Sequence, residues 1–393
     1  MFYACEAKIS LYNNYKYLIL DSQQSDRSQL KSNTCQKECS ALRSILYLCL
    51  TLKNIVRISL FGILLASLFT TSCNLFGTAR GNESLASDTT ISLEAREWSK
   101  KIDQNPKIVD YYTQRAQVFV DEERYDLAQL DYEMAASLEP DVPKHQYLWA
   151  DALFADDKTS LALEHYTEAE NINPNDVTAV FKHAQFLYFV RQFDKGKIKF
   201  GKLLQLNPQH AKGNFLTAML NKEQGDTATA IAYFKATIKL LGSDYNSSMQ
   251  LAEIYNAQGQ DDLALDYYNN AVNIDDASDE AHYARGLFYQ KRGKNEEAMK
   301  DYQRTIDLNA SHYLAYYNAG NILAQNGNYP SAIDHFEICI RLKEDFAKGY
   351  NRIAQCFELL KKNELAIQNY KNCLQIDPNF ALAKEGLSRL GEL

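Results

Sequence analysis

The sequence predicts an all-α solenoid of about eight stacked helix hairpins, and three regularities predict it. The chain repeats with a period of 34 residues over residues 109–378. Each repeat carries apolar residues at helical spacing on both sides of a turn-forming break. Small residues and aromatic rings recur at fixed positions. Hairpins this short bury too little surface to fold alone, so each must stack on its neighbours.

Three positions of the repeat, numbered from Val109, stay in register throughout the array. Position 8 is small: Ala116, Ala150, Ala184, Ala218, Ala252, Gly286, Gly320 and Ala354. Position 20 is also small: Ala128, Ala162, Gly196, Ala230, Ala264, Ala298, Ala332 and Ala366. Position 24 is aromatic: Tyr132, Tyr166, Phe200, Phe234, Tyr268, Tyr302, Phe336 and Tyr370. A small residue followed one helical turn later by a ring predicts close packing between helices.

This pattern, with proline often at position 32, resembles the tetratricopeptide repeat family. The resemblance implies a right-handed superhelix of helix hairpins, in which the first helices line a concave groove and the second helices lie outside. The sequence departs from the family at position 15. Glycine stands there in four repeats, whereas the other four have Glu123, Asp157, Arg191 and Lys361. We expect a less ideal turn in those four repeats.

The first two segments of the chain precede the array. Residues 1–51 show no sustained helical period, and we interpret them as a non-native or unstructured extension. Their pair Cys35 and Cys39 has no second pair of ligands, so no metal site is predicted. Residues 52–72 have basic residues before a twelve-residue apolar run, 58–69. That run is short for crossing a bilayer but suits a secretory signal.

Cys73 follows Thr70-Thr71-Ser72 and resembles the cysteine of a bacterial lipobox, although the lipobox usually has Leu where Thr70 stands. The resemblance implies cleavage before Cys73 and lipidation of its sulfur. Asn74, by resemblance to enterobacterial sorting, favours the outer membrane, and we expect the protein to face the periplasm. An uncleaved membrane anchor is the alternative.

The remaining segments form the array and its connections. Residues 73–88 are small and polar, and they predict a flexible tether. Residues 89–106 predict an amino-terminal capping helix. Trp98 stands 34 residues before Tyr132, so we expect it at position 24 of a hypothetical repeat that precedes the first one. Residues 107–380 hold eight repeats, and residues 381–393 predict a carboxy-terminal capping helix. Caps cover the otherwise exposed apolar faces of the first and last repeats.

Composition and motifs argue against most other classes of function. The chain has a net charge of −8, and a surplus of acidic groups would repel a nucleic-acid backbone. The seven histidines form no metal-binding motif, and neither a glycine-rich phosphate loop nor a GxSxG motif is present. We therefore predict no catalytic residue, cofactor, metal or nucleic-acid partner.

The predicted groove carries an aromatic strip. If first helices line the groove, then positions 5 and 12 supply contact residues: Tyr147, Phe154, Phe181, Tyr188, Phe215, Met249, Tyr283 and Tyr317. Rings offer a large contact area at small entropic cost and favour peptides. The alternative is that such rings are simply good residues for a helix surface. Lys144, Lys182, Lys212 and Lys222 are further groove candidates that would orient an acidic segment, and the alternative is that these lysines only keep the surface soluble.

Three cysteines, Cys339, Cys356 and Cys373, fall in the last repeats. We expect buried free thiols, and a disulfide between two of them stays open.

The resemblance implies a non-enzymatic scaffold, a membrane-anchored lipoprotein that binds proteins or peptides in its groove. Two alternatives remain: a glycan-binding or regulatory subunit of an envelope enzyme, and a cytoplasmic co-chaperone if the signal is spurious.

Overall fold

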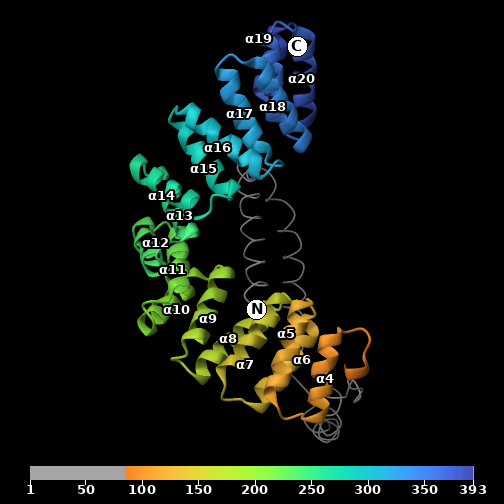
Figure 1. Cartoon of the computed structure of the whole chain (residues 1–393), viewed down its shortest axis with the longest axis vertical. Helices are drawn as coiled ribbons and strands as arrows, with labels where there is room; N and C mark the ends of the chain where they lie inside the picture. Colours follow the sequence, from red (N-terminus) through yellow and green to blue (C-terminus); the bar gives the residue numbers. More distant parts are fainter. Residues whose placement is uncertain (1–84, 393) are drawn as a thin grey trace, which may run out of the picture. The chain divides into compact units, whose positions relative to one another are not determined.

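The computed structural model describes residues 85–392. The predictions for the extension, the signal, Cys73 and most of the tether lie outside these described residues. Within them, the chain forms eighteen α-helices and one short 3-10 helix, without a β-strand (Figure 1). None of these helices is both long enough and apolar enough to cross a bilayer.

Eight helix pairs make up the array and confirm the predicted solenoid of helix hairpins. The 3-10 helix η2 (Leu85–Ser87) and α4 (Leu93–Gln104) precede it. The first helices are α5 (Val109–Asp121), α7 (Pro143–Ala155), α9 (Val177–Phe189), α11 (Ala211–Glu223), α13 (Tyr245–Ala257), α15 (Asp279–Lys291), α17 (Tyr313–Gln325) and α19 (Ala347–Leu359). The second helices are α6 (Tyr125–Leu138), α8 (Thr159–Ile172), α10 (Phe193–Leu206), α12 (Thr227–Leu241), α14 (Asp261–Ile274), α16 (Asn295–Leu308), α18 (Tyr329–Leu342) and α20 (Asn363–Ile376). Helix α21 (Ala381–Arg389) follows the last pair.

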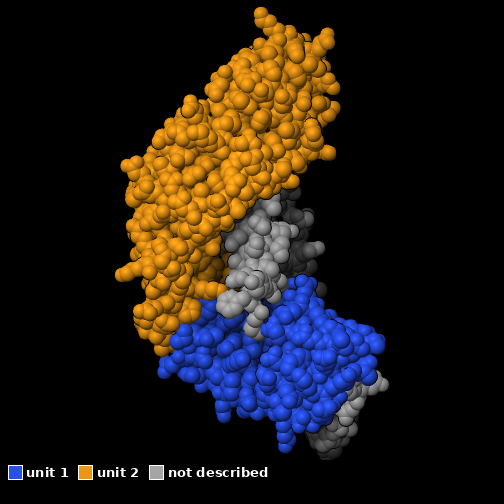
Figure 2. Space-filling model, viewed as in Figure 1, with its two compact units in different colours: residues 1–183 blue, residues 184–393 orange. Residues whose placement is uncertain are grey.

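The array divides into two compact units (Figure 2). Unit 1 ends at His183 and unit 2 begins at Ala184, so the boundary falls inside α9.

The small and aromatic positions form the core of each hairpin. In unit 1, Ala116, Ala128 and Tyr132 have no exposed surface. In unit 2 the ring of Phe336 lies directly against Gly320, where an added Cβ would be 2.7 Å from the ring. The ring at position 24 therefore fills the space that the small residue at position 8 leaves open, which explains why these columns recur together.

The turn between the two helices of a hairpin is the same in all eight repeats. Its residue at position 15 has a positive φ of 70–81° where it is glycine. Glu123, Asp157, Arg191 and Lys361 have φ of 57–59° at the same position. The four non-glycine residues thus keep the turn. They adopt a left-handed backbone conformation that is unfavourable for any residue with a Cβ atom.

The amino-terminal cap differs by one residue from the predicted register. Helix α4 buries Ala95, Ser99 and Ile102, with the same spacing as Ala128, Tyr132 and Ala135 in α6. Ser99, rather than Trp98, therefore takes the place of the aromatic ring, and the prediction for Trp98 is wrong. Trp98 lies half-buried at the edge, with the Lys101 ammonium 3.6 Å from its ring centroid.

The carboxy-terminal helix α21 packs on the last repeat. It buries Ala383, Gly386 and Leu387. Gly386 lies against the ring of Tyr370, so a side chain at this position would clash with it. Close approach to this ring therefore depends on glycine.

Candidate interaction surface on the first helices

The first helices contribute three predicted groove residues to unit 1. Tyr147, Phe154 and Phe181 are each half-buried, so part of each ring contacts the protein and part faces solvent. Burial raises the pKa of Tyr147 to about 12, with smaller contributions from the nearby carboxylates Asp176 and Asp151. Its hydroxyl therefore stays protonated at neutral pH.

In unit 2, four predicted groove rings are half-buried, and most rest on a ring from the second helix of their own repeat. The ring centroids of Phe215 and Phe234 are 5.7 Å apart, as are those of Tyr317 and Phe336. Tyr283 lies 5.9 Å from Tyr302 in the same way. Tyr188 instead contacts Phe189 and Phe193, at 5.7 and 6.0 Å. The rings of Phe215, Tyr283 and Tyr317 are therefore held in place by core packing before any ligand is present.

Met249 does not belong to this surface. It is 5% exposed and packs in the core with Leu251 and Ala252 of its own helix. A side chain this buried has no face left for a ligand, so the prediction of Met249 as a groove residue is wrong.

Polar side chains bridge neighbouring first helices, and α19 to α21, at a constant sequence separation. Lys182 Nζ donates to Asp151 Oδ2 at 2.7 Å, and Lys222 Nζ donates to Glu253 Oε2 at 2.8 Å. Arg352 Nε donates to Asn321 Oδ1 at 2.7 Å, and Arg389 Nε donates to Glu358 Oε1 at 2.9 Å. Each pair is 31 residues apart, one repeat less one helical turn.

These bridges were not predicted from the sequence. A spacing of 31 between complementary side chains is a signal for such pairs, but Asp261 and Arg292 have the same spacing and join α14 to the end of α15. The bridges also correct the role given to two lysines. Lys182 and Lys222 are already bound to carboxylates. Each of these lysines therefore forms an ion pair with a carboxylate of the neighbouring repeat, rather than with an acidic ligand.

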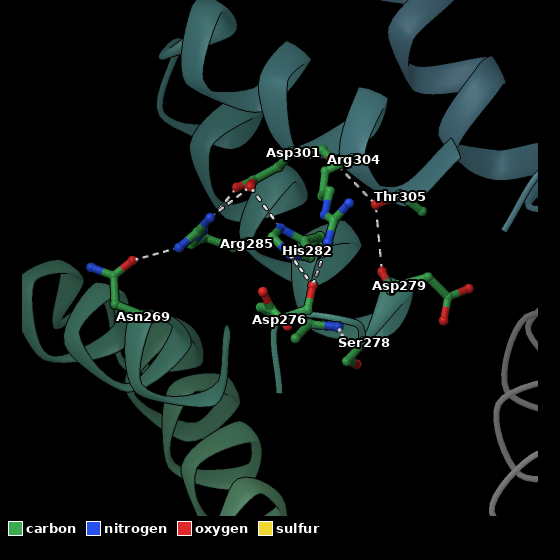
Figure 3. A network of polar contacts seen from close by, with 10 residues as sticks. Asn269, Asp276, Ser278, Asp279, His282, Arg285, Asp301, Arg304 and Thr305 are labelled. Carbon is green, nitrogen blue, oxygen red and sulfur yellow. Dashed lines mark hydrogen bonds and ion pairs between the residues drawn. The ribbon is translucent and has the colours of Figure 1, made fainter. Parts of the chain in front are cut away.

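A second polar cluster lies between α14, α15 and α16 and is structural (Figure 3). The Arg285 guanidinium donates to both oxygens of Asp301, at 2.7 and 2.9 Å, and to Asn269 Oδ1 at 2.9 Å. The His282 ring reaches Asp301 and the Asp276 carbonyl, each at 3.2 Å. These contacts link three helices. Because Asp301 is only 4% exposed, its carboxylate offers no open face for chemistry.

The described part of the chain brings together no three His, Cys, Asp or Glu side chains that could hold a metal ion. Cys339, Cys356 and Cys373 are buried free thiols rather than a disulfide. Burial raises the pKa of Cys339 to about 12 and those of Cys356 and Cys373 to about 11. A thiol with such a pKa is a poor nucleophile at neutral pH, so these cysteines are packing residues.

Comparison with protein families gives a consistent assignment for most of the array. A tetratricopeptide repeat model matches residues 113–177, 215–281 and 283–345, and a second one matches residues 347–380. These segments together exceed half of the chain. No curated protein sequence matches it.

The chain is also similar to solved structures. The C-terminal part of a TPR repeat-containing protein from Cytophaga hutchinsonii is 18% identical, with a TM-score of 0.55, over 61% of this chain and 99% of that one. MamA is 25% identical, with a TM-score of 0.40, over 42% of this chain and 96% of that one. The APC/C hetero-tetramer Cut9-Hcn1 is 17% identical, with a TM-score of 0.43, over 74% of this chain and 57% of that one. The first likeness shows the fold alone.

Proposed function

Because the chain belongs to the tetratricopeptide repeat family, we propose that it is a non-enzymatic scaffold that binds protein or peptide partners on the face of its first helices. The observation that carries this proposal is the set of half-exposed rings, three of which rest on a buried ring of their own repeat. A ring that is already immobile loses little entropy when a ligand covers it.

The bridges between first helices support the same proposal. Lys182 and Asp151, and likewise Arg352 and Asn321, hold polar atoms in fixed positions on first helices. An extended or helical peptide needs both apolar contact and hydrogen-bond partners along its length. The first helices carry groups of both kinds.

The second part of the proposal concerns location. We infer a lipoprotein of the bacterial envelope, anchored by lipid on Cys73 in the outer membrane and facing the periplasm. The support is the order of basic residues, short apolar run, small residues and cysteine in residues 52–73.

Partner capture tests the scaffold. The full chain, used as bait in solubilised envelope, is compared with Phe215→Ala and Tyr317→Ala, which both lie in unit 2. Tyr233→Ala is the matched control, because it truncates a half-buried tyrosine on a second helix. Loss of the same protein partners in the first two variants, with retention in the control, supports the proposal when all variants keep their circular dichroism. Retention of polysaccharide instead of protein would favour the glycan-binding alternative.

Metabolic labelling with palmitate tests the anchor. Wild type is expected to take up label and to fractionate with membranes, whereas Cys73→Ser is expected to do neither. Equal label in both proteins would remove the lipoprotein part of the proposal and leave the scaffold untouched.

A further inference from the structure

The second helices differ in charge in a way that the repeat itself does not require. Helix α10 carries four lysines, Lys195, Lys197, Lys199 and Lys202, against one acidic residue. Helix α12 carries Lys235 and Lys239 and no acidic residue. By contrast, α6, α8 and α14 carry acidic residues and neither lysine nor arginine. Of the eight second helices, only α10 and α12 have a net positive charge, in a chain whose total is −8.

Helix stability does not account for the lysines of α10. Lys195 and Lys197 lie near the start of the helix, which begins at Phe193. The positive end of the helix dipole disfavours cations there. Their placement therefore costs some stability, which suggests that the charge serves another purpose.

An apolar side chain is exposed among the lysines of α10, since Ile198 is 72% exposed. Gly201, one helical turn after Lys197, has open space where a side chain would stand. We call the exposed residues Lys195, Lys197 and Ile198 of α10, together with the half-buried Lys199 and Lys202, the basic patch. The one acidic residue of this helix, Asp194, is also exposed.

The residues of the basic patch lie on one helix. Lys195, Ile198, Lys199 and Lys202 follow one another at spacings of three, one and three residues, which places them on one face of α10. The patch is therefore continuous within this helix.

We propose that the basic patch binds the surface of an anionic lipid bilayer. Lysine is depleted in protein interfaces, where Tyr, Trp and Arg provide the anchors, and the exposed residues of the patch include none of these three. A layer of anionic headgroups attracts lysines without directional requirements, at about a fivefold gain in binding for each lysine. Exposed aliphatic residues gain further by entering the acyl boundary, as on amphipathic helices. This inference does not depend on lipidation of Cys73.

Depth-dependent fluorescence quenching tests the contact directly. The full chain carrying Cys73→Ser, with Ile198→Trp added, is mixed with vesicles whose acyl chains are brominated. One set contains phosphatidylglycerol and phosphatidylcholine, and the other contains phosphatidylcholine alone. The matched control is Leu130→Trp, because Leu130 is 56% exposed at the equivalent position of the acidic helix α6.

We expect quenching at residue 198 with the anionic vesicles only, and no quenching at residue 130. Raising the salt from about 0.1 M to about 1 M, which shortens the screening length from about 10 Å to about 3 Å, should abolish it. Lys195→Glu with Lys197→Glu should weaken vesicle binding by about tenfold or more. Lys300→Glu with Lys384→Glu, which changes the charge equally at two exposed lysines elsewhere, should leave it nearly unchanged.

Equal quenching at residues 198 and 130, or no difference between the two vesicle types, would overturn the proposal. So would loss of a cross-linked protein partner in the Lys195→Glu, Lys197→Glu variant without any loss of vesicle binding, because the patch would then serve an acidic protein. The scaffold proposal is unaffected by either result, since its test uses the first-helix face.

Discussion

Lys361 adopts the left-handed backbone conformation, with a φ of 57°, at the turn position that glycine fills in four other repeats. An L-amino acid there brings its Cβ close to the following carbonyl oxygen. Arg191, Glu123 and Asp157 are in the same situation. At the scale of single residues, the array therefore tolerates local strain where its hairpin packing fixes the turn.

Replacing Lys361 with glycine is expected to stabilise the protein by about 0.5 to 1 kcal/mol, because relief of the strain exceeds the added freedom of the unfolded chain. Urea unfolding followed by circular dichroism measures the change. The control is Lys362→Gly, since Lys362 has a φ of −96° and no strain to relieve. A loss of stability with Lys361→Gly, or an equal gain with Lys362→Gly, would contradict the explanation.

Helices α11 and α17 share an unusual start, which belongs to the scale of elements. Nδ1 of His210 accepts a hydrogen bond from the Gly213 backbone N–H at 2.9 Å, and Nδ1 of His312 accepts one from Ala315 at 3.1 Å. Asp244 holds the same cap position in α13. A histidine can accept in this way only while that nitrogen carries no proton.

Acid is therefore expected to weaken both caps. Burial lowers the pKa of His210 and of His312 below the ordinary value of 6.5, so the folded protein favours the neutral rings. Their contribution to stability is present above pH 6.5 and is lost as the pH falls through the lowered pKa. Urea midpoints between about pH 7.5 and about pH 5 measure it.

The double variant His210→Asp, His312→Asp should flatten this dependence, because aspartate keeps its acceptor oxygens throughout that range. Asn328→Ser, which exchanges one non-titrating cap for another in α18, should leave the dependence unchanged. An unaltered slope in the double variant would show that other groups cause the acid sensitivity.

Asp301 connects three helices through the cluster in Figure 3, so its loss should act on all of them. Asp301→Asn leaves the Arg285 charge without its carboxylate in a largely buried place, and we expect a loss of about 3 to 5 kcal/mol. The double variant Arg285→Leu, Asp301→Leu should lose less, because it leaves no unpaired charge. Asp307→Asn, an exposed change in the same helix, should stay within about 0.5 kcal/mol.

For the whole molecule, the sequence alone predicts the array well because the repeat appears eight times. The columns at positions 8, 20 and 24 predicted the hairpins, and the buried alanines and rings confirm them. The repeat position of a residue is harder to assign in an element that occurs only once. Trp98 was misplaced by one residue because the cap α4 has no second copy to align with.

The surface was harder to predict than the core. Helical periodicity placed Met249 and Tyr283 in the same column, yet Met249 is buried and Tyr283 is half-buried. A thin, flexible methionine enters gaps that a tyrosine cannot, so the column does not determine exposure. The bridges between first helices depend on pairs of residues in different repeats, which a single-repeat pattern does not contain.

If stacking between neighbours is what stabilises the array, removing one whole repeat should leave a folded protein. Deletion of residues 211–244 joins His210 to Tyr245, so α13 begins where α11 began and keeps a capping residue. Helix α13 then presents Leu251 and Tyr255 to α10, at the positions where α11 has Thr217 and Asn221. The new contact is more apolar than the one it replaces, so we expect unchanged helicity per residue and cooperative unfolding.

Deletion of residues 211–227 is the matched test, since it removes α11, its turn and the first residue of α12 but leaves the rest of α12. Loss of half a repeat reverses the direction of every later helix relative to the repeats that precede the deletion, and α12 loses the first helix against which it packs. We therefore expect a clear loss of helicity per residue by circular dichroism and an earlier, broader urea transition. Equal behaviour of the two deletions would mean that the hairpin is not the unit of stability, and that the 34-residue period records sequence similarity alone.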